Sequence, residues 1–263
     1  MAWLELILLG ALQGATEFLP VSSSGHLVIA AKLFAQSSRE TPFLVVMLHA
    51  ATLLSILVFF RRRIALLLTR DWQLWIPLAI GTIPAAVVGF IIKTRFPHFL
   101  ESPVQAGVML LVTAVMLAFS KRIKPGETDC EHVSWRQALL IGCAQAAAIA
   151  PGISRSGATI VAGMAVGLKR MAAAEFSFLL AIPVIGGAAI LEIASAIKDS
   201  SWTAGSDGWG PLIAAMLAAF LVGLASLAWL VRWLRDFRLH HFAWWCAALG
   251  LFAVVYFGIF AAS

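Results

Sequence analysis

Long apolar segments dominate this sequence, and they constrain its fold more than any other feature. A segment of about 20 residues crosses the hydrocarbon core of a bilayer, and six continuous segments reach that length, near 42–60, 73–92, 103–120, 172–197, 211–231 and 242–261. Hydrophobic residues make up 61% of the chain and charged residues 12%, against about 45–50% and about 25% in ordinary globular chains. A soluble domain of this composition could not cover its own surface with polar groups. The sequence therefore predicts one all-α integral membrane domain over residues 1–263.

Two further apolar regions, 3–35 and 135–168, are interrupted by polar turns. The first break runs over 18–26 and the second over 150–157. Each break leaves two helices of about a dozen residues, which are too short to cross a bilayer singly. Unwound backbone at membrane depth has to be buried in protein or to line a wet cavity. We therefore predict two re-entrant helix-turn-helix hairpins beside the six transmembrane helices.

The two interrupted regions also match each other. At an offset of 132 residues (145 − 13), five identities align: Gly10 with Gly142, Gln13 with Gln145, Ser22 with Ser154, Ser24 with Ser156 and Gly25 with Gly157. Each half, about 1–120 and about 135–263, would then hold one hairpin and three spans. Because three is odd, the second half enters from the opposite face, which is an inverted-topology repeat. Two unrelated kinked hairpins are the alternative.

Basic residues collect on one side of the predicted spans. Thirteen lie on that side and five on the other, apart from Arg155, and the thirteen are Arg61, Arg62, Arg63, Arg70, Lys121, Arg122, Lys124, Arg136, Lys169, Arg170, Arg232, Arg235 and Arg238. The positive-inside rule makes that side cytoplasmic and places both termini outside. The net charge of +6 thus reports topology, not binding of nucleic acid.

The three cysteines are far apart and indicate neither a disulfide framework nor a zinc site.

Glu17, His26 and Arg155 are ionisable residues predicted at membrane depth. Each costs several kcal/mol there unless it is paired or wetted, so function is the default interpretation. A buried ion pair of Glu17 with Arg155 that only ties the hairpins together is the alternative.

The residues around Arg155 suit a phosphate group. Phosphoryl transfer is catalysed mainly by positioning and by stabilising charge on the equatorial oxygens. Arg155 offers a bidentate fork, Ser154 and Ser156 offer hydroxyls, and Gly157 lets a helix start whose free N–H groups attract anions. The first hairpin has the same kind of turn at 22–25. Capping explains either turn alone, but both together predict an anion site between facing hairpins.

Two side-chain pairs at helical spacing could serve this site. His26 follows Ser23 at i+3, so its imidazole could accept the hydroxyl proton or attack phosphorus itself. Glu17 follows Gln13 at i+4 on one helix face, where a carboxylate and an amide oxygen can hold a hard divalent cation. An interhelical hydrogen bond would explain Gln13 equally well. His49, inside a span, is interpreted as a hydrogen-bonding residue that faces the interior.

Three stretches resemble the signatures of the undecaprenyl-pyrophosphate phosphatase family of the bacitracin-resistance type. Residues 13–26 are similar to its first signature, (E/Q)xxxE followed by a PVSS-S/T-GH stretch. Residues 151–159 match its PGxSRSxxT signature, and residues 175–183 resemble a third characteristic stretch. The order and spacing of these stretches cover nearly the whole chain.

The resemblance implies hydrolysis of undecaprenyl pyrophosphate to undecaprenyl phosphate and inorganic phosphate, which recycles the lipid carrier for peptidoglycan synthesis. It also implies a divalent cation, Mg²⁺ or Ca²⁺, with Glu17 and Gln13 as its ligands. Many members have Glu at the position of Gln13, so Glu17 is the only carboxylate of the pair here. The nucleophile stays open among Ser23 assisted by His26, His26 itself and metal-bound water. The implied catalytic residues are Glu17, Ser23, His26 and Arg155, and the implied substrate-binding residues are Ser22, Ser24, Gly25, Ser154, Ser156, Gly157 and Thr159.

Two other classes of membrane protein share features with this sequence. Type 2 phosphatidic acid phosphatases need an Arg-Pro and a second His soon after a Ser-Arg, and this sequence has neither. A transporter of polyprenyl phosphate is the alternative that remains, because inverted repeats with discontinuous helices are a transporter architecture. The resemblance further implies the bacterial inner membrane, a polyprenyl pyrophosphate lipid as partner and no nucleic acid. A homodimer is one possible assembly.

Overall fold

The computed structural model describes residues 2–33, 42–96, 100–124, 126–198, 209–236 and 238–260. Within these ranges the regular elements are helices: α1 (Ala2–Phe18), α2 (Ser23–Leu33), α3 (Pro42–Phe59), α4 (Arg61–Thr69), α5 (Trp75–Arg95), α6 (Pro103–Ser120), α7 (Trp135–Ala147), α8 (Arg155–Ala165), α9 (Arg170–Lys198), α10 (Trp209–Arg235) and α11 (Phe242–Val255). Fully within the same described ranges, short 3₁₀ turns at Trp72–Leu74, Cys130–His132 and Leu239–His241 and a π turn at Tyr256–Phe260 join or extend them.

The predicted spans coincide with long apolar helices. In the described part of the chain, five helices are long and apolar enough to cross a membrane: α5 with the turn before it, α6, α9, α10 and α11 with its flanking turns. The sixth predicted span forms α3, which passes the same test together with α4 across a bend of 72°. The protein is therefore a multi-pass membrane protein, as its composition predicts.

The segment 61–72, which the sequence leaves as the connection between the spans near 42–60 and 73–92, is mostly the helix α4. Arg63 connects this helix to the rest of the bundle through ion pairs. Its guanidinium pairs with Asp71 and Glu175, and its Nη2 lies 2.8 Å from Glu131 Oε1. Asp71 follows the end of α4, Glu131 lies in the turn before α7, and Glu175 lies in α9, so one half-buried cation joins three parts of the chain.

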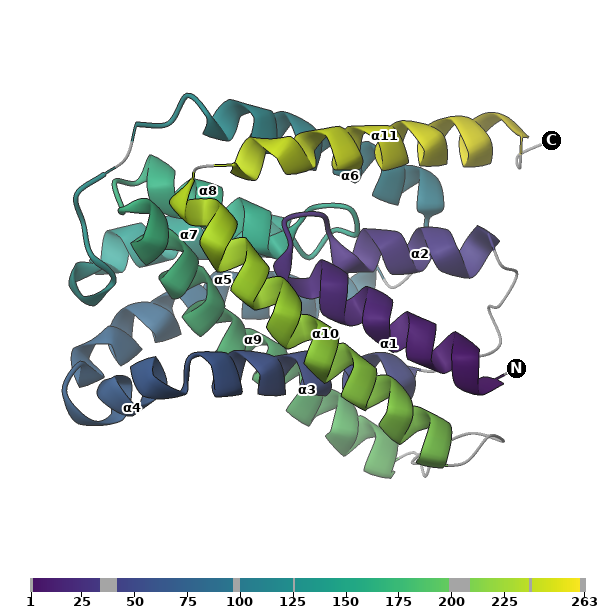
Figure 1. Ribbon diagram of the computed structural model, residues 1–263, viewed down its shortest axis with the longest axis horizontal. Helices are drawn as coiled ribbons and strands as arrows, with labels where there is room; N and C mark the ends of the chain where they lie inside the picture. The colour runs from purple at the N-terminus through teal and green to yellow at the C-terminus, as the bar shows by residue number, and fades with distance from the viewer. Residues whose placement is uncertain are drawn as a thin grey trace.

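The two predicted hairpins enter the bundle from opposite ends. Figure 1 shows α1 and α2 reaching in from the end where both termini lie, while α7 and α8 reach in from the other end. The turns between the paired helices meet near the middle of the molecule. At 17 residues, α1 is longer than expected, because the polar turn begins only after Phe18. The last two residues predicted for the first region, 34–35, lie outside the described part.

Each hairpin packs its first helix against a span from the other half. A Cβ on Gly10 of α1 would lie 2.1 Å from the Ala215 carbonyl oxygen of α10, and a Cβ on Gly142 of α7 would lie 2.4 Å from the Gly81 carbonyl oxygen of α5. Small residues allow such backbone approach in membranes. The partners are offset by 134 residues (215 − 81) and the glycines by 132. In addition, α3 packs on α9 and α6 on α11. These pairings agree with a repeat, whereas the orientation in the bilayer stays a prediction.

Candidate active site

Ser22 and Ser154 cap the second helices of the two hairpins. Ser22 Oγ accepts from Gly25 N at 3.3 Å, and Ser154 Oγ accepts from Gly157 N at 3.1 Å, so each hydroxyl satisfies a free N–H of a helix start. Ser22 Oγ also accepts from Gly152 N at 3.1 Å. The capping interpretation is therefore correct for both serines, and Ser22 in addition hydrogen-bonds one hairpin turn to the other.

The next hydroxyls repeat this arrangement. Ser24 Oγ lies 3.3 Å from Ser22 Oγ, and Ser156 Oγ lies 3.2 Å from Ser154 Oγ. Ser156 also donates to the Leu19 carbonyl of the first turn at 3.2 Å. Both turns are thus lined with hydroxyls and face each other, as the sequence predicts.

The last span of each half holds the hairpin turn of the other half. Thr113 of α6 donates through Oγ1 to the Gly152 carbonyl at 2.8 Å, and it accepts from Ser154 N at 3.1 Å. Cys246 of α11 donates through Sγ to the Pro20 carbonyl at 3.6 Å. The two donors differ by 133 residues and the two carbonyls by 132, so the contacts correspond within the repeat.

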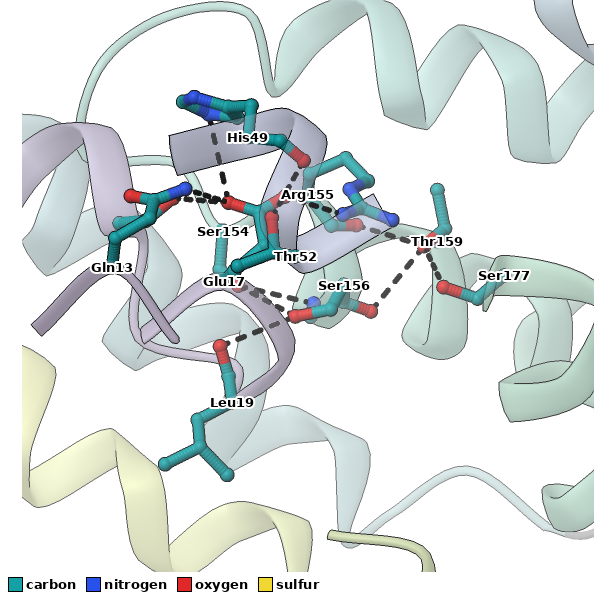
Figure 2. Close-up of polar contacts among 12 residues, drawn as sticks. Gln13, Glu17, Leu19, His49, Thr52, Ser154, Arg155, Ser156, Thr159 and Ser177 are labelled. Carbon is teal, nitrogen blue, oxygen red and sulfur yellow. Dashed lines mark hydrogen bonds and ion pairs between the residues drawn. The ribbon is translucent and has the colours of Figure 1, made fainter. Parts of the chain in front are cut away.

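Glu17 lies at the centre of the polar contacts between the hairpins (Figure 2). Gln13 Nε2 donates to its Oε2 at 3.0 Å, and Ser23 Oγ donates to the same oxygen at 2.8 Å. Arg155 Nη2 donates to Oε1 at 2.7 Å, and His49 Nε2 lies 3.7 Å from Oε2. Glu17 is only 8% exposed. A buried carboxylate with this many partners is held in one place.

Two polar atoms at this site have no hydrogen-bond partner among the described residues. They are Nη1 of Arg155 and Oε1 of Gln13, and both atoms are buried. A buried donor or acceptor left unpaired costs about 1–3 kcal/mol, so both atoms call for a partner such as water, an ion or a substrate. The guanidinium N–H suits an anion, and the amide oxygen suits a cation or a donor.

His26 is engaged differently from the sequence-based expectation. Its Nδ1 lies 2.8 Å from the Ser22 carbonyl oxygen, and its Nε2 accepts from Trp245 Nε1 at 2.8 Å. Ser23, which the helical spacing places near this imidazole, donates to Glu17 instead. In this structure the group within reach of the Ser23 proton is therefore the carboxylate.

Two of the predicted substrate-binding residues, Thr159 and Gly25, contact other parts of the protein. The Thr159 hydroxyl donates to the Arg155 carbonyl at 2.8 Å and lies 2.5 Å from Ser177 Oγ, as Figure 2 shows. A Cβ on Gly25 would lie 2.9 Å from Gly152 Cα, so this glycine allows the turns to approach. In this conformation both residues position their neighbours.

Four residues of the site were missed from sequence, or were not given a role there: His49, Thr113, Ser177 and Trp245. His49 carried a usable signal, because an ionisable residue inside a span marks function by default. Ser177 lies in the third stretch that resembles the family, residues 175–183, whereas Thr113 and Trp245 are ordinary span residues in sequence. Only the packing of their helices shows what they contact.

The donor set is compatible with a divalent cation that arrives with a phosphate. Glu17 and the unpartnered Gln13 Oε1 are hard oxygen donors of the type that Mg²⁺ and Ca²⁺ prefer. Among the described residues, no group of three His, Cys, Asp or Glu could hold a metal ion. The remaining ligands would thus have to come from water and from the ligand itself, which is usual for Mg²⁺ bound to phosphates.

Comparison with known proteins agrees with the resemblance of the motifs. The family model described as bacitracin resistance protein BacA matches residues 6–252. A protein of Rhodopirellula baltica named undecaprenyl-diphosphatase is 46% identical over 252 residues, which cover 96% of this chain and 97% of that protein. Undecaprenyl-diphosphatase 4 of Bacillus thuringiensis strain Al Hakam is 37% identical over 97% of both chains, and the undecaprenyl-diphosphatase of Bacteroides thetaiotaomicron is 36% identical over 97% and 99%. With this similarity over almost its whole length, the chain belongs to the bacitracin resistance protein BacA family.

Proposed function

We propose that this membrane protein hydrolyses undecaprenyl pyrophosphate to undecaprenyl phosphate and inorganic phosphate between its two hairpins. One observation carries the proposal: the buried, unpartnered Nη1 of Arg155 lies on the guanidinium that also holds Glu17, the carboxylate to which Ser23 donates. A cationic donor for phosphate and a hydroxyl bonded to a base thus share one centre. The three relatives above, all named undecaprenyl-diphosphatases, support the same substrate.

Ser23 is the nucleophile in this proposal, and Glu17 accepts its proton. Ser23 Oγ attacks the terminal phosphorus, the bond from that phosphorus to the bridging oxygen breaks, and undecaprenyl phosphate leaves. Arg155 stabilises the charge on the phosphoryl oxygens. Its unpartnered Nη1 would bind the phosphate while Nη2 stays on Glu17 Oε1. Water then attacks the phosphorus of the phosphoserine and the bond from phosphorus to Ser23 Oγ breaks. Glu17 returns its proton to Ser23 Oγ and takes one from the attacking water, and inorganic phosphate leaves.

A divalent cation would be held by Glu17 and by Oε1 of Gln13 together with the pyrophosphate. When bound, it neutralises charge on the phosphate oxygens. The protein residues hold the carboxylate in place through Gln13 Nε2 and keep Ser23 on its Oε2. Because a single carboxylate is a weak site for such a cation, we expect affinity for the metal to rise in the presence of substrate.

We also propose an orientation of the protein in the bacterial inner membrane. The basic residues favour the side of α4 and of the 121–134 segment as cytoplasmic, which would put both termini outside the inner membrane. The spent pyrophosphate carrier appears at the outer face, so we place the substrate entrance there. A homodimer stays a prediction.

The test is release of phosphate from undecaprenyl pyrophosphate by the purified protein in detergent. We expect release that stops when a chelator is added and returns with Mg²⁺ or Ca²⁺, and that is lost in Ser23→Ala. Release by Ser23→Ala at the wild-type rate would contradict the nucleophile. Absence of release by the wild-type protein, with cation present, would contradict the proposed function.

Transport of polyprenyl phosphate is the second candidate, and the opposed hairpins favour it, because discontinuous helices that meet in the middle of a repeat are found in transporters. It predicts movement of the lipid across a vesicle wall in Ser23→Ala as well as in the wild type. Detergent has no second compartment, so release of phosphate there reports hydrolysis alone.

A further inference from the structure

Several residues at the centre of the site differ between the two hairpins. At the offset of 132, Glu17 corresponds to Ile149, Ser23 to Arg155 and His26 to Ala158. On the last spans the offset is 133, so Trp245 corresponds to Val112. The contact between Trp245 and His26 therefore occurs in one half only. The symmetry of the repeat therefore does not explain why Trp245 contacts His26.

The geometry of this contact defines the protonation state and the tautomer of the His26 imidazole. Trp245 Nε1 lies 2.8 Å from His26 Nε2, and the two rings are nearly parallel, with an interplanar angle of 4° and centroids 6.1 Å apart. An indole nitrogen can only donate and a carbonyl can only accept. His26 Nε2 is thus the acceptor, and Nδ1 carries the proton that is donated to the Ser22 carbonyl. The imidazole is neutral with its proton on Nδ1.

The Ser22 carbonyl belongs to the residue on which the turn depends. Ser22 has φ 67°, in the left-handed region that costs a residue with a side chain about 1–3 kcal/mol and persists only where the surroundings enforce it. Its carbonyl is held by His26 and its hydroxyl by Gly152 N. Ser23 follows immediately and reaches Glu17. The orientation of Ser23 thus depends on a chain of contacts that starts at Trp245.

We propose that Trp245 is a positioning residue for the phosphatase reaction: it keeps His26 neutral and aimed at Ser22, and the braced turn then presents Ser23 to Glu17. This role rests on the proposed function. In this proposal His26 stabilises the turn through the Ser22 carbonyl, and it is neither the general base nor the nucleophile. Trp245 is 57% exposed, whereas His26 is only 7% exposed.

Protonation of His26 would oppose this arrangement directly. An imidazolium carries N–H groups on both nitrogens, so Nε2–H would point at the indole N–H. The helices packed on α2 offer little compensation: α6 has no acidic or basic side chain over Pro103–Ser120, and Cys246 is the one titratable group of α11 over Phe242–Val255. That thiol donates to Pro20. Glu17 of α1 is bonded to Gln13, Ser23 and Arg155.

The experiment compares Trp245→Phe with Trp244→Phe, a matched control on the neighbouring residue, which is 79% exposed. The full-length protein carrying ¹⁵N-labelled histidine is titrated by NMR in detergent, and the His26 signals are assigned by their loss in His26→Gln. We expect a neutral imidazole with its proton on Nδ1 down to low pH in the wild type and in Trp244→Phe. In Trp245→Phe, Nε2 loses its donor and binds a proton at higher pH. An identical titration of His26 in Trp245→Phe and wild type would overturn the proposal.

Phosphate release from undecaprenyl pyrophosphate is then measured against pH in the same three proteins. We expect the acid limb of Trp245→Phe to move toward neutral pH, with release at pH 8 within about tenfold of wild type, since one lost neutral hydrogen bond is worth about 1 kcal/mol. A uniform loss at every pH without a shift of the limb would mean that the indole only packs. If the wild type releases no phosphate at all, the proposed function fails, while the titration still decides what Trp245 does to His26.

Discussion

Ser23 and Arg155 occupy equivalent positions in the two hairpins and donate to the two oxygens of one carboxylate. They are separated by 132 residues, and each is the first residue of the second helix of its hairpin. Ser23 reaches Oε2 of Glu17 and Arg155 reaches Oε1. The same position of the repeat thus supplies a hydroxyl in the first hairpin and a cation in the second. The repeat brings them together, and the difference between the residues makes the site chemically asymmetric.

Glu17→Gln should abolish most of the hydrolysis while the fold persists. The amide keeps the shape but cannot accept the Ser23 proton or pair with Arg155. We expect release of phosphate from undecaprenyl pyrophosphate to fall about 10²–10⁴-fold, the range for loss of a general base. The exposed residue Glu127 provides the control, because Glu127→Gln should leave release unchanged. Wild-type release by Glu17→Gln would remove the carboxylate from the mechanism.

Arg155→Lys tests whether one group has to serve both the carboxylate and the phosphate. A lysine has a single ammonium, whereas the guanidinium presents separate N–H groups to Glu17 and to a phosphate oxygen. We expect release to fall about 10²–10³-fold, as for other losses of an oxyanion donor. Arg62→Lys, on the exposed face of α4, should behave as wild type. Equal activity of both variants would show that charge alone is sufficient.

Thr113→Val tests the tie between α6 and the second hairpin. The substitution keeps the volume but leaves the Gly152 carbonyl and the Ser154 N–H without their partner. Each buried group left unpaired costs about 1–3 kcal/mol, so the melting temperature and phosphate release should both fall. Thr94→Val removes an exposed hydroxyl bonded to Phe90 within its own helix and should change neither. An unaltered melting temperature in Thr113→Val would show that the turn does not depend on this contact.

Gly142→Ala tests the close packing of α7 on α5. The added Cβ would lie 2.4 Å from the Gly81 carbonyl oxygen, which is backbone and cannot yield cheaply, so we expect loss of folded protein or a large drop in melting temperature. At Gly187 of α9 no atom lies within 4 Å of the added Cβ. Gly187→Ala should therefore be neutral or stabilise the helix by about 1 kcal/mol. Similar melting temperatures of the two variants would contradict the packing.

The spans and hairpins could be predicted because bilayer thickness sets the length of an apolar helix, and because Pro20 and Gly152 stand in polar stretches that interrupt it. The helix α4 could not be found in this way. Ion pairs connect its Arg63 to three separate parts of the chain, and the pattern RRR at its start indicates only a topology signal.

Part of the site could be predicted because ionisable and hydroxyl side chains are unusual at membrane depth. Glu17, Arg155 and the serines of both turns were expected to lie together, and they do. The partner of His26 was expected to be Ser23 because helical spacing was the only guide, and the structure pairs it with Ser22 and Trp245 instead. Spacing along one helix cannot describe a contact made by another helix 219 residues away.

The amino-acid sequence alone is enough to place this protein in a membrane, to locate the breaks in two of its apolar regions, and to match its ionisable groups to a phosphate. These properties depend on local composition and on the cost of polar groups in hydrocarbon. Only the tertiary structure decided which atoms meet: that Ser23 donates to Glu17, that Arg155 retains an unpaired N–H, and that an indole from α11 holds His26. Those contacts depend on how helices from the two halves cross, and packing of that kind is encoded by many weak interactions spread over the whole chain.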